Sequence, residues 1–428
     1  MPHLNKVGAA VSGSDDPDRA ARSSLSRLRI ALTVFFALDG FMFAGWVVRI
    51  PAIKQQIGAS ESDLGLALLG VSAGAVVTMM ATGRLCRRFG SHPVTVVSAV
   101  LLSLSIALPP QAHSALALGL VLLAFGTAYG ALNVAMNSAA VDLVAALRRP
   151  VMSSFHAAFS LGGMVGAGVG GLVAGGLSPT VHLLLLTGLG LLVTAVIGPV
   201  LLRQPVPVPE RDQRAEEQER AEGAERVRDG ARGLGRGSRR AVLLFGVIAL
   251  CTAYGEGAMA DWSALHLTES LGASAGVAAA GYSLFALAMT AGRLSGTLLL
   301  ERLGQTRALV SGGLAAAFGM LLGALAPTVW LALAGFAVAG LGLANIFPVA
   351  VGRAGALAGP GGVAAASTLG YGGMLLGPPA IGFLADWFTL PLALTTVALL
   401  AGAAALVAYT ARSASTEISS CGDLLVRD

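Results

Sequence analysis

The sequence predicts an all-α membrane protein with twelve transmembrane helices in two six-helix bundles. Its 428 residues are 55% hydrophobic and only 12% charged, which is hard to reconcile with a water-soluble globule. The apolar residues form about a dozen runs, each long enough to cross a hydrocarbon core of ~30 Å as a helix. Backbone polar groups cannot stay unpaired in lipid, and the runs lack the alternation of a β-barrel, so the crossing segments are expected to be helical.

One densely charged stretch, 203–240, divides the runs into two sets of six. The first bundle, 28–202, is predicted to hold spans at 28–48, 64–82, 93–110, 115–141, 152–176 and 181–202. The second bundle, 241–410, is predicted to hold spans at 241–264, 275–299, 308–326, 330–350, 362–385 and 390–410. Cytoplasmic tails are expected at 1–27 and 411–428. The stretch 203–240 carries ten arginines and eight acids, so it is predicted to be a solvated cytoplasmic linker.

Basic residues and tryptophans predict the orientation of the chain. Nearly all basic residues outside the spans fall on the side of the linker, whereas Arg49 and Lys54 fall on the other side. Because basic loops stay in the cytoplasm, both termini and the linker are predicted to be cytoplasmic, in a multi-pass protein of the cytoplasmic membrane. The outer ends of four spans carry residues that favour the membrane interface, namely Trp46, Trp262, Trp330 and Trp387.

The two halves repeat one another. Arg88-Phe89-Gly90 corresponds to Arg302-Leu303-Gly304 about 214 residues later, and Gly130-Ala131-Leu132-Asn133 corresponds to Gly342-Leu343-Ala344-Asn345. Parallel repeats of this kind pack as two bundles around an axis along the membrane normal, with the ligand site between them near the midplane. The repeat therefore predicts a carrier that works by alternating access.

With this repeat and the motifs below, the chain resembles the major facilitator superfamily over essentially its whole length. The run GRLCRRFG at 83–90 keeps the glycines and Arg88 of that family's motif after the second span, with Arg87 where the family has an acid. The second half keeps the acid, as Glu301, with Arg302 and Gly304. The resemblance implies that Arg88, Glu301 and Arg302 form a conformational latch that holds the bundles together in the outward-facing state.

Longer strings resemble one branch of that family, the MosC-like or YbjJ-like group. They are WVVRIPAI from Trp46, SSFHAAFSLGG from Ser153, EGAMADWSA from Glu256, GLGLANIFP from Gly340 and STLGYGGMLLGPP from Ser367. This resemblance implies transport of small polar metabolites, including sugar or inositol derivatives.

Two acids inside the spans are candidates for proton coupling. Asp39 lies about eleven residues into the first span, and a carboxyl at that depth faces a cavity or a partner. It could take up a proton in one conformation and release it in another; the alternative is a packing hydrogen bond to a neighbouring helix. Glu256, between Gly255 and Gly257 in the seventh span, is the second candidate.

A polar stripe in the fourth span predicts solute contacts. Tyr129, Asn133 and Asn137 are spaced by four residues and so share a helical face, and Asn345 occupies the repeat-related position in the tenth span. Amides donate and accept hydrogen bonds, which suits hydroxyl-bearing ligands. His156 and Tyr371 complete the predicted substrate-binding set. The alternative for each is a structural hydrogen bond between helices.

Other polar or special residues are expected to be structural. Arg293 is expected either to extend to the membrane interface or to pair with Glu301. Asp261 is expected either to cap a helix or to pair at the interface, for example with Arg49 or Lys54. Gly377-Pro378-Pro379 is expected to break or kink the eleventh span. The glycines of the fifth span are expected to let helices approach closely: Gly162, Gly163, Gly166, Gly168, Gly170 and Gly171.

These features predict a monomeric secondary transporter of a small polar or amphipathic solute, coupled to protons and embedded in the lipid bilayer. No catalytic residue, metal, cofactor or nucleic-acid partner is expected. A proton-exchanging exporter of drug-like compounds stays open as an alternative, because the glycines of the fifth span resemble an exporter motif without its proline. A membrane receptor that binds a solute without moving it is the alternative from a different class.

Overall fold

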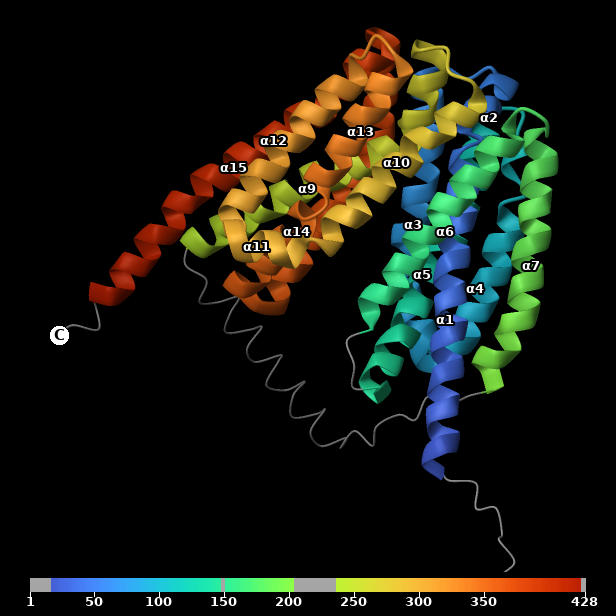
Figure 1. Cartoon of the computed structure of the whole chain (residues 1–428), viewed down its shortest axis with the longest axis horizontal. Coiled ribbons are helices and arrows are strands. Elements are labelled where there is room, and N and C mark those ends of the chain that lie inside the picture. The colour runs from blue at the N-terminus through green and yellow to red at the C-terminus, as the bar shows by residue number, and fades with distance from the viewer. Residues whose placement is uncertain (1–16, 148–150, 204–235, 425–428) are drawn as a thin grey trace, which may run out of the picture.

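The computed structural model describes residues 17–147, 151–203 and 236–424, which are helical almost throughout (Figure 1). These residues contain no strand, which confirms the predicted all-α class. Most of the predicted linker and of the first predicted tail lies outside the described residues.

The first bundle is built from seven helices and one short 3₁₀ turn. Six of the helices cross the bundle, and α2 lies at one end. The elements are α1 (Pro17–Val47), α2 (Ile50–Ile57), α3 (Glu61–Phe89), α4 (Ser91–Ser105), η1 (Pro109–Gln111), α5 (Ala115–Leu147), α6 (Met152–Ala174) and α7 (Pro179–Arg203).

The second bundle begins at Arg236 and contains two helices that are interrupted part-way. Its elements are α9 (Arg236–Leu265), a π-helical turn η2 (His266–Ser270), α10 (Ala275–Leu294), α11 (Gly296–Leu303), α12 (Gln305–Ala324), α13 (Val329–Leu343), α14 (Ile346–Trp387) and α15 (Leu390–Leu424). The tenth predicted span is divided between α13 and the start of α14.

The eleventh predicted span also belongs to α14, which is 42 residues long. Eleven described segments are long and apolar enough to cross a membrane, and 362–385 is not among them. A Cβ on Gly362 would nevertheless overlap the carbonyl oxygen of Ala354, eight residues earlier. These residues would be ~12 Å apart along a straight helix, so α14 folds back between them and carries the end of one crossing and the whole of the next. The structure thus agrees with twelve crossings.

The backbones of α1 and α6 touch in the first bundle. A Cβ on Gly162 would overlap the carbonyl oxygen of Ala37, and one on Gly40 would overlap the carbonyl oxygen of Phe159. Gly166 meets Phe41 of α1 in the same way. Lipid tails are as apolar as the helices, so close packing of this kind is a main source of helix association in membranes. The predicted role of the glycines in the fifth span is confirmed at Gly162 and Gly166, whereas Gly168 meets no other helix.

The two bundles touch at one end of the molecule. We call the side where α7 ends at Arg203 and α9 begins at Arg236 the linker side, and the opposite side the far side. In Figure 1 the ribbons meet near α2 and diverge toward the linker side. On the far side, Gly171 of α6 packs on Gly276 of α10, and Gly65 of α3 packs on the backbone of Pro378 and Pro379 of α14.

The prolines of α14 do not break the helix, so one of the two predicted outcomes, a break or a kink, is excluded. Helical structure continues through Pro378 and Pro379 to Trp387. Neighbouring helices can stabilise a proline-containing segment in a membrane bundle, and here the backbone at both prolines is covered by Gly65 of α3. These residues form part of the far-side contact.

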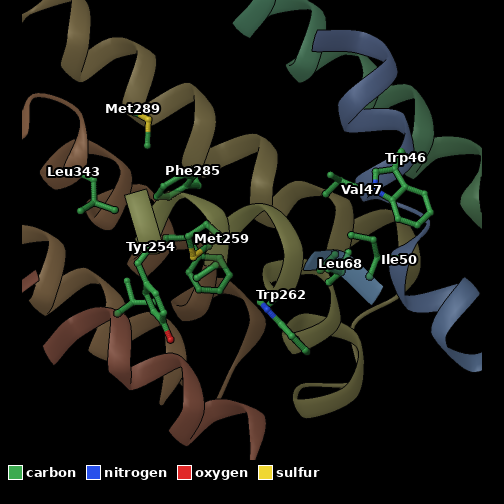
Figure 2. Packing of buried hydrophobic residues seen from close by; sticks show 14 of the residues in the cluster. Trp46, Val47, Ile50, Leu68, Tyr254, Met259, Trp262, Phe285, Met289 and Leu343 are labelled. Carbon is green, nitrogen blue, oxygen red and sulfur yellow. The ribbon is translucent and has the colours of Figure 1, made fainter. Parts of the chain in front are cut away.

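Two of the four tryptophans are buried in the protein, although they lie near the ends of α1 and α9 as predicted. Trp46 and Trp262 are 1% and 0% exposed, whereas Trp330 and Trp387 are each 75% exposed. Figure 2 shows Trp46 and Ile50 of the first bundle and Trp262 of the second within one cluster of buried apolar side chains. The cluster continues from one bundle into the other because α2 packs against α9. Trp46 and Trp262 therefore strengthen the far-side contact.

Polar contacts close the far side further, and we call them the far-side clasp. The Lys54 ammonium group donates to Glu61 at 3.1 Å and to Glu269 of the second bundle at 2.9 Å. The backbone amides of Glu61 and Ser62 donate to the Asp386 carboxylate at 3.0 and 3.1 Å, and the Ser62 hydroxyl also contacts it. Free amides at a helix start favour a carboxylate, so Asp386 caps α3 from the opposite bundle. Lys54 therefore has partners other than the predicted Asp261.

We expect alanine at position 162 to destabilise the first bundle and alanine at 168 to do no harm. The added methyl group of Gly162→Ala would overlap the α1 backbone, and overpacking costs ~1–3 kcal/mol. A Cβ on Gly168 meets no atom within 4 Å, so Gly168→Ala only gains helix propensity of up to ~1 kcal/mol. Thermal unfolding of both variants in detergent measures the difference; equal melting temperatures would contradict the contact.

The far-side clasp is expected to persist between about pH 4 and pH 10. Burial alone would lower the pKa of Lys54, but hydrogen bonds and charges of Glu269 and Glu61 outweigh burial and raise it. The stabilisation from the Lys54 ion pairs is therefore present below the ordinary lysine pKa and is lost as pH rises through the raised pKa of Lys54. Burial alone would raise the pKa of Asp386, but hydrogen bonds from Ser62 and Glu61 lower it overall. The stabilisation from Asp386 is present above the ordinary aspartate pKa and is lost as pH falls through the lowered pKa.

Spin labels on the exposed positions Gln55 and Ser270 would report this pH dependence as a distance across the clasp. The distance should stay constant from pH 5 to 9, about a unit inside each ordinary pKa, and lengthen outside that window. The Lys54→Gln variant should show the longer distance within the window too. A distance that Lys54→Gln leaves unchanged would contradict the role of the clasp.

Candidate functional site

Asp39 is buried inside the first bundle without a hydrogen-bond partner. It is 0% exposed, and neither carboxylate oxygen meets a donor within the described parts of the chain. The contact of Gly40 with α6 brings that helix close beside it. Asp39 therefore lies inside the protein, and neither the expected opening nor a packing hydrogen bond is observed at its carboxyl group within the described residues. Its role in proton coupling stays a prediction.

Aromatic rings next to Asp39 connect the two bundles. Phe43, one helical turn further along α1, stacks on Tyr129 of α5 with ring centroids 5.2 Å apart. On its other side Phe43 meets Tyr282 of α10 edge-on at 6.4 Å. Tyr129 also lies within electrostatic range of Asp39, Tyr282 and Tyr371 of α14. The predicted residues Asp39, Tyr129 and Tyr371 thus lie in one region, at the boundary between the bundles.

Glu256 and Arg293 form an ion pair between α9 and α10. Two guanidinium-to-carboxylate contacts measure 3.0 and 3.2 Å. The predicted pairing of Arg293 with Glu301 is wrong, because Arg293 extends toward Glu256 on the neighbouring helix. The Arg293 side chain is 47% exposed and that of Glu256 is 23% exposed, so the pair borders open space. Tyr282 lies within electrostatic range of both charges, which connects the pair to the aromatic rings.

His156 of α6 is exposed and lies across from this pair. Its ring packs edge-on against Phe36 at 5.6 Å, and the charge of Arg293 acts on it from the opposite bundle. It therefore adds an imidazole from the first bundle to the region that holds the Glu256–Arg293 pair. We call the whole set the central cluster: Asp39, Phe43, Tyr129, His156, Glu256, Tyr282, Arg293 and Tyr371.

The predicted asparagines are placed differently from one another. Asn137 donates to the backbone oxygen of Asn133 at 2.8 Å and to its side-chain oxygen at 3.4 Å, so both amides lie on one face of α5. Asn345 donates to the carbonyl oxygen of Gly292 at 2.9 Å, within its own bundle. That Asn133 and Asn345 meet on one ligand stays a prediction.

Arg49 and Asp261 do not pair, contrary to the expectation. Arg49 donates from Nε to Nδ1 of His182 at 2.8 Å and contacts the carbonyl oxygens of Ala174 and Val173. Its guanidinium group therefore binds α6 and α7 together. Asp261 is half-buried and lies within electrostatic range of Tyr282.

The predicted latch residues are exposed at the linker side. Arg88 lies over the ring of its neighbour Phe89 at 5.2 Å, and Glu301 and Arg302 lie at the end of α11. Across the described residues, none of the three makes an ion pair with the opposite bundle. The latch stays a prediction for another conformation.

An apolar cavity of about 970 Å³ between α3, α4 and α5 holds none of the predicted site residues. Its lining is mostly leucine, valine and alanine, with a few hydroxyl groups. Such a lining suits lipid acyl chains better than a polar solute.

Sequence reasoning did not identify Phe43 and Tyr282, and it gave Arg293 only a structural role. Phe43 follows Asp39 by four residues, and Tyr282 and Arg293 are isolated polar residues in an otherwise small and apolar span. Their positions in the sequence could have marked these residues as candidates. The residues that they contact lie on other helices, however, and the sequence does not show which helices are neighbours.

The chain matches known transporters over most of its length. A family model described as Major Facilitator Superfamily matches residues 30–299. An uncharacterized MFS-type transporter of Yersinia pestis is 33% identical over 376 residues, 87% of this chain and 92% of the relative. Membrane protein MosC of Rhizobium meliloti is 32% identical over 368 residues, 84% of each chain.

A solved structure agrees at the level of the fold. It is a bacterial homolog of the human lysosomal transporter Spinster, in an inward-facing and unoccupied conformation. The TM-score is 0.74 at 14% sequence identity, over 91% of this chain and 97% of that one. Together with the sequence relatives, it shows that this chain is a membrane transporter that belongs to the major facilitator superfamily, on the MosC-like branch.

Proposed function

We propose that this transporter moves a small polar or amphipathic solute across the cytoplasmic membrane by alternating access, with protons as the coupling ion. It works as a monomer, with the linker and both termini in the cytoplasm. The observation that carries the proposal is Asp39, a fully buried carboxyl without a hydrogen-bond partner in the described residues, close to where the bundles meet.

The contacts between the bundles support alternating access. The Lys54–Glu269 pair, the Asp386 cap and the glycine contacts of α3 and α6 all lie on the far side. With the linker in the cytoplasm, this arrangement is an inward-facing state. Release of the far-side clasp and approach of the linker-side ends give the outward-facing state, in which Arg88, Glu301 and Arg302 act as the latch.

Proton coupling follows from the surroundings of Asp39. A charged carboxylate without a partner is costly away from water, so a bound proton is the simplest way to keep Asp39 buried. Movement of the bundles that lets water or a cation reach Asp39 allows the proton to leave. Glu256 is the second coupling residue, because a proton on its carboxylate would release Arg293.

The chemistry of the central cluster supports a solute without a large net charge. Tyr129 and Tyr371 offer aromatic faces and hydroxyl groups, and Asn133 and Asn137 offer amides on the adjoining face of α5. Such groups bind hydroxyl-bearing or amphipathic molecules. The charges of Glu256 and Arg293 cancel, so the pair can form hydrogen bonds with a solute that carries no net charge.

Export of drug-like compounds in exchange for protons is the alternative within the same class. The same residues would serve, and only the direction of solute movement relative to the proton would differ. Solute-dependent acidification inside liposomes indicates proton symport, whereas solute-dependent alkalinisation indicates antiport. A receptor that binds without transport would give solute binding and no proton movement.

We expect Asp39→Asn to abolish solute-coupled proton movement while solute binding persists. Purified protein would first be screened against metabolites by thermal shift, and hits would be tested in liposomes containing a pH-sensitive dye. Asparagine keeps the size of the side chain but cannot exchange a proton, so coupled flux should fall at least about a hundredfold, as expected for loss of an acid–base group.

Asp142→Asn is the matched control, because Asp142 is an exposed acid of α5 in the same bundle. It should keep full coupled flux. Unchanged coupling in Asp39→Asn would contradict the role of Asp39. Absence of gradient-dependent flux for every solute that binds would contradict the coupled transporter.

The Glu256–Arg293 pair is expected to show a measurable coupling energy. A double-mutant cycle of Glu256→Gln, Arg293→Gln and the double variant isolates the pair. Because the Arg293 side chain is about half exposed, we expect only ~0.5–1 kcal/mol in thermal or denaturant unfolding. Strictly additive effects would contradict an ion pair that stabilises this conformation.

A further inference from the structure

A polar cavity of about 550 Å³ lies in the second bundle, next to the helix interruptions and toward the linker side. Its lining includes four polar side chains, those of Arg293, Gln305, Asn345 and Arg353, and the small residue Gly352. The volume is within the range of small-molecule sites, ~300–1,000 Å³. Gln305, Asn345 and Arg353 form no part of the central cluster.

The cavity adjoins two helix interruptions that brace each other. The α10–α11 interruption lies at Ser295, and the α13–α14 interruption lies at Ala344 and Asn345. The Asn345 amide donates to the carbonyl oxygen of Gly292 at 2.9 Å, and Arg293 Nε donates to that of Ala344 at 3.3 Å. Carbonyl groups freed by each interruption are thus bound by side chains from the other, which fixes the shape of this cavity wall.

The charge of Arg353 is not balanced by an acid. Arg293 is paired with Glu256, but Arg353 makes no ion pair within the described residues, and its Nε is buried without an acceptor there. Its guanidinium group lies 5.9 Å from the ring centroid of Phe245, a contact that leaves the N–H groups free to donate. Glu301, Arg302 and Arg307 lie on neighbouring helices and are exposed outside the cavity lining. A buried donor without an acceptor is unfavourable, so an anion in the cavity would be stabilised.

We propose that this cavity is a second ligand site, which adjoins the central cluster at Arg293 and binds a phosphate group through Arg353 with Gln305 and Asn345 as amide donors. The planar guanidinium group matches the geometry of phosphate oxygens. Basic pockets between helices at the membrane surface bind lipid head groups, so the phosphate belongs either to an anionic phospholipid or to a soluble phosphorylated compound.

Two probes distinguish these sources on the purified full-length protein. Native mass spectrometry compares binding of phosphatidylglycerol with that of phosphatidylcholine, and thermal shift measures stabilisation by glycerol 3-phosphate and inorganic phosphate. Preferential binding of phosphatidylglycerol would identify a lipid site, and stabilisation by the soluble phosphates would identify a metabolite site. Either result supports the proposal only if it depends on Arg353.

Arg353→Gln should weaken binding of the successful probe at least about tenfold, the loss expected for one charge-assisted hydrogen bond. Gly352→Leu should have a similar effect with Arg353 intact, because a Cβ at Gly352 meets no atom within 4 Å and the side chain would fill the cavity. This second variant keeps the test valid if Arg353→Gln does not fold.

Arg84→Gln is the matched control, an exposed arginine of α3 in the other bundle. It should leave probe binding unchanged. The proposal is overturned if phosphatidylglycerol binds no better than phosphatidylcholine and neither soluble phosphate stabilises the protein. It is also overturned if Arg84→Gln weakens binding as much as Arg353→Gln and Gly352→Leu do.

Discussion

The contact between the backbones of α1 and α6 is the interaction on which the site most depends. Gly40 and Gly162 let the two helices approach until no side chain fits between them. Lipid offers no hydrophobic drive for helix pairing, so this proximity supplies the van der Waals energy that holds α1 in place. Asp39 is on α1 beside Gly40, so this contact fixes the position of the helix segment that carries the fully buried carboxyl group.

Few charged residues are buried within the bundles, and they differ in how their charges are balanced. Lys54 joins acids from both bundles at the far side, where the cost of burial is offset by two partners. Glu256 and Arg293 neutralise one another within the central cluster. Asp39 and Arg353 differ from these, since within the described residues each has buried side-chain atoms without a hydrogen-bond partner and no oppositely charged partner. A bound proton would remove the unpaired charge of Asp39, and a bound anion would pair with Arg353.

Sequence reasoning predicted the depth of residues in the membrane better than their partners. The helical class, the crossings, the close packing of the fifth span and the burial of Asp39 follow from hydropathy and small-residue spacing, which act along one helix. The partner of Arg293, the inward position of Trp46 and Trp262, and the unbroken helix at Pro378 depend on which helix lies opposite. Rotation of a helix about its own axis and the identity of its neighbour are set by tertiary packing, which a hydropathy profile does not contain.

One patch of the far-side contact, where α1, α6 and α10 meet, is made of short side chains. Ala44, Val48, Ala167 and Ala279 form a separate buried cluster there, and Gly171 packs on Gly276 beside them. Short side chains of this kind have few or no rotamers to rearrange and do not interlock, so the surfaces can separate and rejoin without repacking either bundle. In the proposed transport cycle this patch would open without repacking, so lengthening its alanine side chains would slow turnover without touching the solute.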